Sequence, residues 1–355
     1  MNEKKKFFRL LDCTLRDGGY YNNWNFSKPE IQKYLNAIST TGIEYVELGF
    51  RFFESEKIKG LTAYTSQNLL KVLSVPKNLN LGIMINASDL VQNNSLKIDI
   101  LKKLINKKNL SKIKFVRIAC HHHEIFLLKK CFNYLKNIKV KIFINIMQIS
   151  EIDLLMFKRI LDFLNKNQIK CIYLADSLGC LNSKKLNKII NFLKKNWRGE
   201  TGLHAHNNLN LAFSNSKIAI KNDFQWIDST ITGMGRGPGN TRTEDILNFN
   251  YNYKISRKFL ETKSFFSNLK KIHKWGSNKY YVLAAKNKIH PTYIQKLLSD
   301  ERYKKKNYLQ IINQLKKIDA KKFNPYKLVN STFFLSKTLA GANEPKKIFD
   351  NKYFL

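Results

Sequence analysis

Short apolar runs alternate along the first two thirds of the chain with longer segments in which apolar residues recur every three or four positions. The short runs predict β-strands, and the longer segments predict amphipathic helices. The predicted strands cover residues 7–13, 43–49, 80–86, 114–119, 140–147, 170–175, 202–206 and 226–231. Helical patterns follow at residues 27–42, 66–75, 96–106, 126–135, 152–165, 183–197 and 209–220.

This alternation predicts the fold class. Strands that alternate with helices form right-handed βαβ units around a parallel sheet. Eight such strands predict an α/β protein whose sheet closes into a TIM (β/α)8 barrel. The helix at 27–42 also has a local start signal, because Ser27, Pro29 and Glu30 have the spacing of a capping box.

The rhythm changes after residue 245. Residues 246–355 contain helical patterns at 265–275 and 308–318 but no convincing alternation of strands and helices. We therefore predict a catalytic barrel domain over residues 1–245. Residues 246–355 are predicted to form a helical appendage, either a lid over the barrel mouth or an oligomerisation element.

Composition supports a packed globular chain of unusual charge. Of the 355 residues, 43% are hydrophobic and 12% aromatic, and the formal net charge is +37. A polyanion such as nucleic acid is one partner that this charge would suit. The lysines are spread over nearly every segment, however, which is typical of a compositional bias rather than a localised footprint. A nucleic-acid partner is therefore not expected.

The cysteines indicate a reducing compartment, and the start of the chain argues against a signal peptide. The five cysteines form no CxxC pair, and three lie in or beside apolar runs, where free thiols are common. The basic start of the chain resembles a signal peptide, but Arg9 and Asp12 interrupt its apolar part. No apolar run approaches the ~20 residues that a membrane span needs. We expect a cytoplasmic protein without a membrane partner.

Candidate chemistry begins at the end of the first strand. Arg16 and Asp17 follow that strand, and Gly18 and Gly19 come next, so we expect a sharp turn there. In α/β proteins the carboxyl ends of the strands are where ligands bind.

Two histidines follow on the predicted seventh strand. His204 and His206 are two residues apart, so their imidazoles are expected on the same side of the strand. Two histidines and a carboxylate are a common ligand set for a divalent metal, and Asp17 can approach from the first strand. The alternative is a pair of strand histidines that bind backbone groups. Beyond the eighth strand, the glycine-rich loop at 233–240 lets the backbone approach a ligand closely.

These segments, in this order, resemble the DRE-TIM metallolyase family, also called the HMG-CoA-lyase-like family. The matching segments are residues 11–18, 175–179, 204–209 and 233–240, which span the barrel. The resemblance implies a TIM barrel and a divalent metal, with manganese as first choice and magnesium, zinc or cobalt as alternatives. The implied ligands are Asp17, His204, His206 and Asn240. It also implies that Arg16 steadies a developing enolate and that Glu47 is an acidic residue of the mouth.

Within the family, the chain is most similar to the 4-hydroxy-2-oxovalerate aldolases. HMG-CoA lyases have a catalytic cysteine where this chain has Gly237. Isopropylmalate and homocitrate synthases usually have glutamine at the position of Tyr20, and the aldolases have a catalytic histidine there. Tyr20 is therefore the positional candidate for the base, or else an aromatic residue that only shapes the pocket.

Other residues are candidates for contacts with substrate. Gly18 would allow close approach, and Asp176 would either bind substrate or brace its loop. Arg51 would pair with a substrate carboxylate or with Glu54, and Arg236 would hold a second anionic group. One histidine of the run 121–123 is a further candidate for the base.

The sequence thus predicts a metal-dependent aldolase or lyase that acts on a 2-oxo acid, with pyruvate enolate as intermediate. An acyl-CoA-condensing synthase of the isopropylmalate or homocitrate synthase type is the alternative enzyme, and a basic nucleic-acid-binding protein is the alternative outside enzymes. The expected partners are the small-molecule substrate, further copies of the chain and, by resemblance alone, an aldehyde dehydrogenase.

Overall fold

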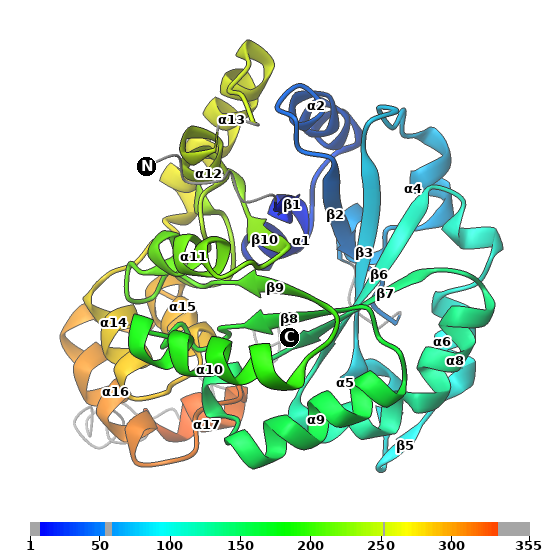
Figure 1. Ribbon diagram of the computed structural model, residues 1–355. Coiled ribbons are helices and arrows are strands. Elements are labelled where there is room, and N and C mark those ends of the chain that lie inside the picture. The colour runs from blue at the N-terminus through cyan, green and yellow to red at the C-terminus, as the bar shows by residue number, and fades with distance from the viewer. Residues whose placement is uncertain (1–7, 54–58, 251–252, 333–355) are drawn as a thin grey trace, which may run out of the picture.

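A computed structural model of the protein describes residues 8–53, 59–250 and 253–332. Its centre is a closed barrel with the strand order β1-β10-β9-β8-β7-β6-β3-β2, all pairs parallel (Figure 1). The barrel strands are β1 (Arg9–Asp12), β2 (Tyr45–Phe50), β3 (Asn80–Asn86), β6 (Ile113–Cys120), β7 (Lys141–Ile146), β8 (Cys171–Ala175), β9 (Glu200–His204) and β10 (Trp226–Ser229). The predicted TIM barrel is confirmed.

Helices surround the barrel, as the periodicity predicts. The main ones are α2 (Lys28–Ile38), α4 (Gln67–Val72), α6 (Ile98–Leu104), α8 (Lys129–Asn137), α9 (Leu154–Lys166), α10 (Ser183–Asn196) and α11 (Ala212–Lys221). Shorter elements are α3 (Leu61–Tyr64), α5 (Ala87–Leu90), α7 (His122–Ile125) and the small antiparallel pair β4 (Val91–Gln92) and β5 (Ser95–Leu96). Single 3-10 turns lie at Lys108–Leu110, Phe126–Leu128, Ile149–Glu151, Ile231–Gly233 and Lys305–Asn307. The capping box at Ser27 and Glu30 is present at the start of α2.

The prediction of a sharp turn after β1 was wrong. Residues 16–19 lie inside a helix, α1 (Thr14–Asn22), which starts almost directly after the strand. Side chains press on both glycines: a Cβ at Gly18 would lie 2.7 Å from Met234 Sδ, and one at Gly19 would lie 2.0 Å from Trp24 Cδ1. The two glycines are therefore needed because Met234 and Trp24 pack where a Cβ would lie, and not because the backbone turns there.

The helical region at the C-terminal side divides into two parts. Its helices are α12 (Thr243–Phe249), α13 (Arg257–His273), α14 (Lys279–Lys286), α15 (Pro291–Ser299), α16 (Tyr308–Lys316) and α17 (Pro325–Asn330). Buried side chains of α12 and α13, such as Ile246 and Phe266, belong to the core of the barrel, and α13 packs beside α2. A second core joins residues of α14 to α17. The predicted domain boundary at 245 falls within α12.

The second of these parts contacts the mouth of the barrel. Gln295 in α15 accepts a hydrogen bond from Gly237 N (3.0 Å) and donates one to Tyr20 O (3.1 Å). In Figure 1, α14 to α17 lie together on the side of α10 and α11. Among the described residues, no helix combines the length and apolarity needed to cross a membrane.

Candidate metal centre

Three predicted ligands meet at the carboxyl end of the barrel. Asp17 comes from α1, His204 is the last residue of β9, and His206 follows two residues later. One ligand atom from each lies within 4.8 Å of the others, and His204 Nε2 is 3.8 Å from Asp17 Oδ2. The two imidazole rings are nearly perpendicular, with centroids 5.1 Å apart. Two imidazoles and one carboxylate form a ligand set that suits a divalent metal.

Asn240 completes this group from the glycine-rich loop. An isolated antiparallel bridge pairs Asn240 with His206, and the Asn240 amide donates a hydrogen bond to Asp17 Oδ2. The loop passes so close that a Cβ at Gly235 would lie 2.6 Å from Asp17 Oδ2. Only glycine fits at that position, which explains one of the glycines of the motif.

The donor atoms fit a bound cation. His206 Nδ1 and Asn240 Oδ1 are buried and have no hydrogen-bond partner among the described residues, which is costly unless another group satisfies them. Burial lowers the pKa of His206 well below its usual range, which favours the neutral imidazole that metals bind. Burial would raise the pKa of Asp17, but the Arg16 guanidinium outweighs it, so the carboxylate stays ionised.

Arg16 lies beside the candidate metal ligands and is almost fully buried. Its Nε donates to Glu47 Oε2 (2.7 Å), and Nη1 donates to Asp17 Oδ1 (2.5 Å). Its third nitrogen, Nη2, is buried and has no partner among the described residues. The two carboxylates fix the guanidinium, and the remaining donor is left to bind an anion in the mouth.

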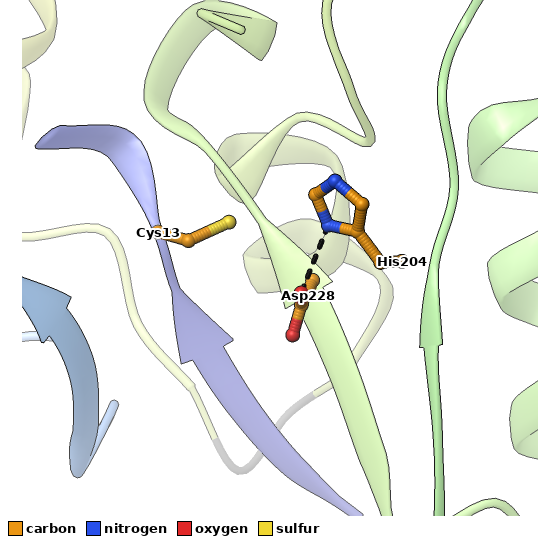
Figure 2. Close-up of side chains that lie close together, drawn as sticks. All are labelled: Cys13, His204 and Asp228. Carbon is orange, nitrogen blue, oxygen red and sulfur yellow. Dashed lines mark hydrogen bonds and ion pairs between the residues drawn. The ribbon is translucent and has the colours of Figure 1, made fainter. Parts of the chain in front are cut away.

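Asp228, which the sequence reasoning missed, fixes the orientation of His204. Figure 2 shows its carboxylate hydrogen-bonded to the His204 ring, with Oδ2 2.9 Å from Nδ1. Burial would raise the pKa of Asp228, but Arg117 outweighs it, so the ionised carboxylate can only accept. Nδ1 therefore carries a proton, which leaves Nε2, 3.8 Å from Asp17 Oδ2, as the ring nitrogen that faces the candidate metal position. Metal-binding histidines are commonly held by such a carboxylate.

Cys13 also lies close to His204 and Asp228, so these three residues look like a second ligand set (Figure 2). Asp228 Oδ2 is already shared between His204 and Arg117 Nη1 (2.8 Å). Burial raises the pKa of the Cys13 thiol well above its usual range, and the thiol donates to Ser229 O (3.4 Å). A thiol that keeps its proton is a poor metal ligand, and Asp228 Oδ2 is already engaged by two partners.

Arg117 is the second functional residue that the sequence reasoning missed. It is fully buried in β6, donates to Asp228 and Glu47, and its guanidinium lies 3.9 Å from the centre of the Tyr173 ring. Glu47 and Asp228 thus link Arg16 and His204 through one buried chain of ion pairs. A sequence signal existed, because an arginine inside a strand that is expected to be buried on both faces needs a partner.

The mouth itself is a small cavity of about 40 Å³. Six of the predicted site residues line it: Arg16, Asp17, Tyr20, His204, His206 and Arg236. Arg236 stacks its guanidinium 5.3 Å from the centre of the Tyr20 ring. Burial raises the pKa of Tyr20 although Arg236 opposes it, so the phenol keeps its proton at neutral pH.

Three other predicted substrate contacts lie away from this lining. Gly18, in α1, is buried and packs against Met234. Arg51 is buried and donates to the backbone carbonyls of Thr65, Leu104 and Asn109, while Glu54 lies outside the described residues. Asp176 braces its own loop by accepting from Cys180 N and Leu181 N, and burial raises its pKa to about 7.

The histidine run at 121–123 begins helix α7. Burial lowers the pKa of His121 to about 4, and the neighbouring Lys322 adds to the effect. The rings of His121 and His123 stack with centroids 5.7 Å apart. None of the three residues is among those that line the mouth cavity.

Comparison with known proteins gives a consistent picture. The model of the HMGL-like family matches residues 7–273. The chain is 24% identical over 245 residues to the 4-hydroxy-2-oxovalerate aldolase of Geobacillus genomosp. 3, covering 68% of this chain and 69% of that one. The aldolase of the same name from Carboxydothermus hydrogenoformans is 26% identical (67% and 69% covered). Oxaloacetate decarboxylase of Mycobacterium tuberculosis is 24% identical (66% and 67% covered).

Solved structures have the same fold. The N-terminal domain of a Bacteroides vulgatus protein assigned as an aldolase superposes with a TM-score of 0.74 at 27% identity, covering 83% of this chain and 98% of that domain. The HMG-CoA lyase of Bacillus subtilis superposes with a TM-score of 0.61 at 16% identity, covering 74% and 94%. At that identity the second likeness concerns the fold alone.

Proposed function

The chain belongs to the HMGL-like family of metal-dependent carbon–carbon lyases, and on this premise we propose that its substrate is a 2-oxo acid that is cleaved through a pyruvate enolate. Cleavage next to a keto group leaves an electron pair that must be held as an enolate. Arg16 carries the proposal. It is a fixed cation with a buried, unpartnered Nη2, and it lies beside a ligand set for a divalent metal.

Asp17, His204, His206 and Asn240 are the residues that would hold the metal. When bound there, a divalent cation supplies a Lewis acid that polarises the keto group of the substrate. Carboxylate, imidazole and amide oxygen are suitable ligands for manganese, magnesium and zinc alike. Manganese is our first choice because the family resemblance favours it. Asp228 keeps His204 in the tautomer that leaves Nε2 free.

The first candidate reaction is retro-aldol cleavage of a 4-hydroxy-2-oxo acid. A base takes the proton of the C4 hydroxyl, the C3–C4 bond breaks, and its electron pair forms the enolate beside Arg16 Nη2. An aldehyde leaves, and protonation of the enolate at C3 gives pyruvate. The relatives named 4-hydroxy-2-oxovalerate aldolase support this candidate.

Tyr20 favours a second candidate, the decarboxylation of a 2-oxo diacid. Its raised pKa makes the phenol a proton donor rather than a base. In a decarboxylation the bond to the departing carboxylate breaks, carbon dioxide leaves with no base, and the phenol gives its proton to C3 of the enolate. A relative named oxaloacetate decarboxylase agrees with this reaction.

One experiment separates the candidates. The manganese-loaded protein is incubated with 4-hydroxy-2-oxovalerate or with oxaloacetate, and pyruvate is followed by proton NMR against a protein-free control containing the same manganese. Pyruvate with an aldehyde supports the first candidate, and pyruvate above the control rate from oxaloacetate alone supports the second. Thiol release from acetyl-CoA with a 2-oxo acid, and no pyruvate from either substrate, would contradict both and favour the synthase alternative.

Tyr20→Phe tests the proton donor. If Tyr20 protonates the enolate, this variant loses turnover while its manganese affinity stays unchanged. Unchanged turnover would leave Tyr20 only the shaping of the pocket. The proposal also retains a cytoplasmic location, assembly with further copies of the chain, and an aldehyde dehydrogenase as the enzyme that would consume the aldehyde of a retro-aldol reaction.

A further inference from the structure

A second and much larger cavity lies at the opposite, amino-terminal end of the barrel. Its volume is about 920 Å³, and its lining includes residues at the starts of β6, β7 and β8. We call it the amino-terminal bowl. Its cationic lining residues are Arg9, Lys114, Lys136, Lys141, Lys170 and Arg198.

The only carboxylate among the described residues that line the bowl is already engaged. Glu200 accepts from Arg9 Nη1 (2.9 Å) through Oε1 and from Trp226 Nε1 (2.7 Å) through Oε2. The Arg9 guanidinium also lies 5.0 Å from the centre of the Trp226 ring. Arg9 and Glu200 therefore balance each other, and the charge of the other cations remains.

Five of those cations are exposed. Lys136 donates to Asn167 O, and the other four lie at or just before the starts of neighbouring strands. Lys141 is the register partner of Phe115, which follows Lys114, and Lys170 directly precedes β8. Within residues 8–53, 59–250 and 253–332, no carboxylate lies within salt-bridge distance of Lys114, Lys141, Lys170 or Arg198. Their positive charge is therefore not offset by a carboxylate of the described chain, and a bound anion would offset it.

The floor of the bowl strengthens the effect of these charges. Phe115 and Phe143 stack with ring centroids 5.2 Å apart, and Trp226 packs on Phe143 at 5.1 Å. These buried rings close the barrel interior below the cations. A concave surface of one sign with apolar walls focuses the electric field and concentrates counter-ions.

We propose that the amino-terminal bowl binds a small anion that carries linked phosphates, such as a nucleoside triphosphate or inorganic triphosphate. The cavity lies within the roughly 300–1,000 Å³ range of small-molecule sites. Several lysines and an arginine on different strands and loops match an anion with charges on several atoms, rather than a single carboxylate. A recessed bowl with a closed floor suits a compact ligand better than an extended nucleic acid.

Titration calorimetry on the full chain tests this inference. Excess magnesium is present, so that a phosphate ligand does not strip metal from the mouth, and the salt concentration is physiological. The ligands are inorganic tripolyphosphate, ATP and AMP. We expect one-to-one binding of tripolyphosphate and ATP and at least 10-fold weaker binding of AMP. Tighter binding of ATP than of tripolyphosphate identifies a nucleotide as the ligand, and equal affinity identifies the phosphate chain; both support the proposal.

Matched variants test whether binding is local. The double variant Lys141→Glu, Lys170→Glu should weaken tripolyphosphate binding at least 10-fold. The control is the double variant Lys184→Glu, Lys188→Glu, which changes the net charge by the same amount on the exposed face of α10. This variant should weaken tripolyphosphate binding less than 2-fold. Circular dichroism and lyase activity check that both variants are folded, and neither depends on the bowl.

Three results would overturn the inference. Equal weakening in both double variants would show diffuse attraction to a chain of charge +37. Absence of tripolyphosphate binding to the wild type would remove the site. Far tighter binding of a single-stranded RNA than of tripolyphosphate, with the same dependence on Lys141 and Lys170, would assign the surface to nucleic acid. Each result leaves the lyase proposal untouched, because that proposal is tested at the mouth.

Discussion

At the carboxyl end of the barrel, Arg16 and Arg117 are buried among Asp17, Glu47 and Asp228, and each guanidinium contacts at least two carboxylates. At the amino end, four cations line the bowl with no carboxylate of the described chain within salt-bridge distance, because the lining carboxylate, Glu200, pairs with Arg9. The mouth cavity measures about 40 Å³ and the bowl about 920 Å³.

The difference teaches how one barrel uses charge in two ways. Buried charges at the mouth are stable because each contacts an opposite charge, and these contacts hold each group in a single geometry. Exposed charges at the bowl keep their hydration and their freedom, so they attract ligands without fixing a geometry. Substitutions at the mouth should therefore have large and specific effects, whereas those at the bowl should have small ones.

The largest effect is expected from the metal ligands. Asp17→Ala or His206→Ala should weaken manganese binding by on the order of 1,000-fold, beyond the roughly 10–100-fold cost of losing a residue that supports a ligand. Calorimetric titration with manganese measures this loss. Asp99→Ala, in exposed α6, is the control and should bind as wild type does. Full occupancy in either mouth variant would exclude that residue as a ligand.

The second largest effect is expected from Arg16→Gln. It removes the fixed cation beside the enolate, and loss of one such donor lowers kcat by roughly 100- to 1,000-fold. Steady-state kinetics with the substrate identified by NMR measures the change. Because Arg16 does not bind the metal itself, manganese affinity should fall much less than in Asp17→Ala; an equal fall would show that Arg16 acts mainly by holding Asp17.

The pair Asp228→Asn and Cys13→Ser separates the two neighbours of His204. Asp228→Asn should weaken manganese binding roughly 10- to 100-fold, because His204 loses the acceptor that fixes its tautomer. Cys13→Ser keeps a donor to Ser229 O and should leave affinity unchanged. If Cys13→Ser matched Asp228→Asn, the trio in Figure 2 would be a ligand set after all.

The smallest effect is expected at the bowl. Lys141→Gln removes one of several like charges and should raise the free energy of unfolding by ~0.2–1 kcal/mol, the size of an exposed charge interaction. Urea denaturation at low and at high salt measures it, and the gain should shrink as salt screens the repulsion. A loss of stability at low salt would mean that Lys141 has a stabilising partner.

Much of the fold could be predicted from periodicity, because strands and helices bury different patterns of positions. The strand at residues 80–86 is found with the same bounds, and the helix at 183–197 differs by one residue. The helix at Gly18 and Gly19 could not be predicted, since the side chains that make glycine necessary there come from Trp24 and Met234. Propensity alone favours a turn at such a pair.

The candidate site could be predicted in part. Asp17, His204 and His206 follow from spacing and strand order, and the structure brings them together. Arg51 could not be placed, because its backbone acceptors come from loops whose position depends on the whole fold. The bowl is invisible in the sequence for the same reason. Its cations come from segments up to nearly 200 residues apart, between Arg9 and Arg198, within a chain that is lysine-rich throughout.

The contacts of Trp24 with helix α1 have a consequence for attempts to change the substrate specificity of this enzyme. Trp24 covers Gly19 and donates to Arg16 O at 2.8 Å, so it anchors the backbone that carries Arg16 and Asp17. Tyr20 lies on the same helix but lines the cavity. Because the Tyr20 ring packs edge-on against Trp24, with centroids 4.9 Å apart, an exchange at position 20 would disturb both the proposed proton donor and the residue that anchors Arg16 and Asp17.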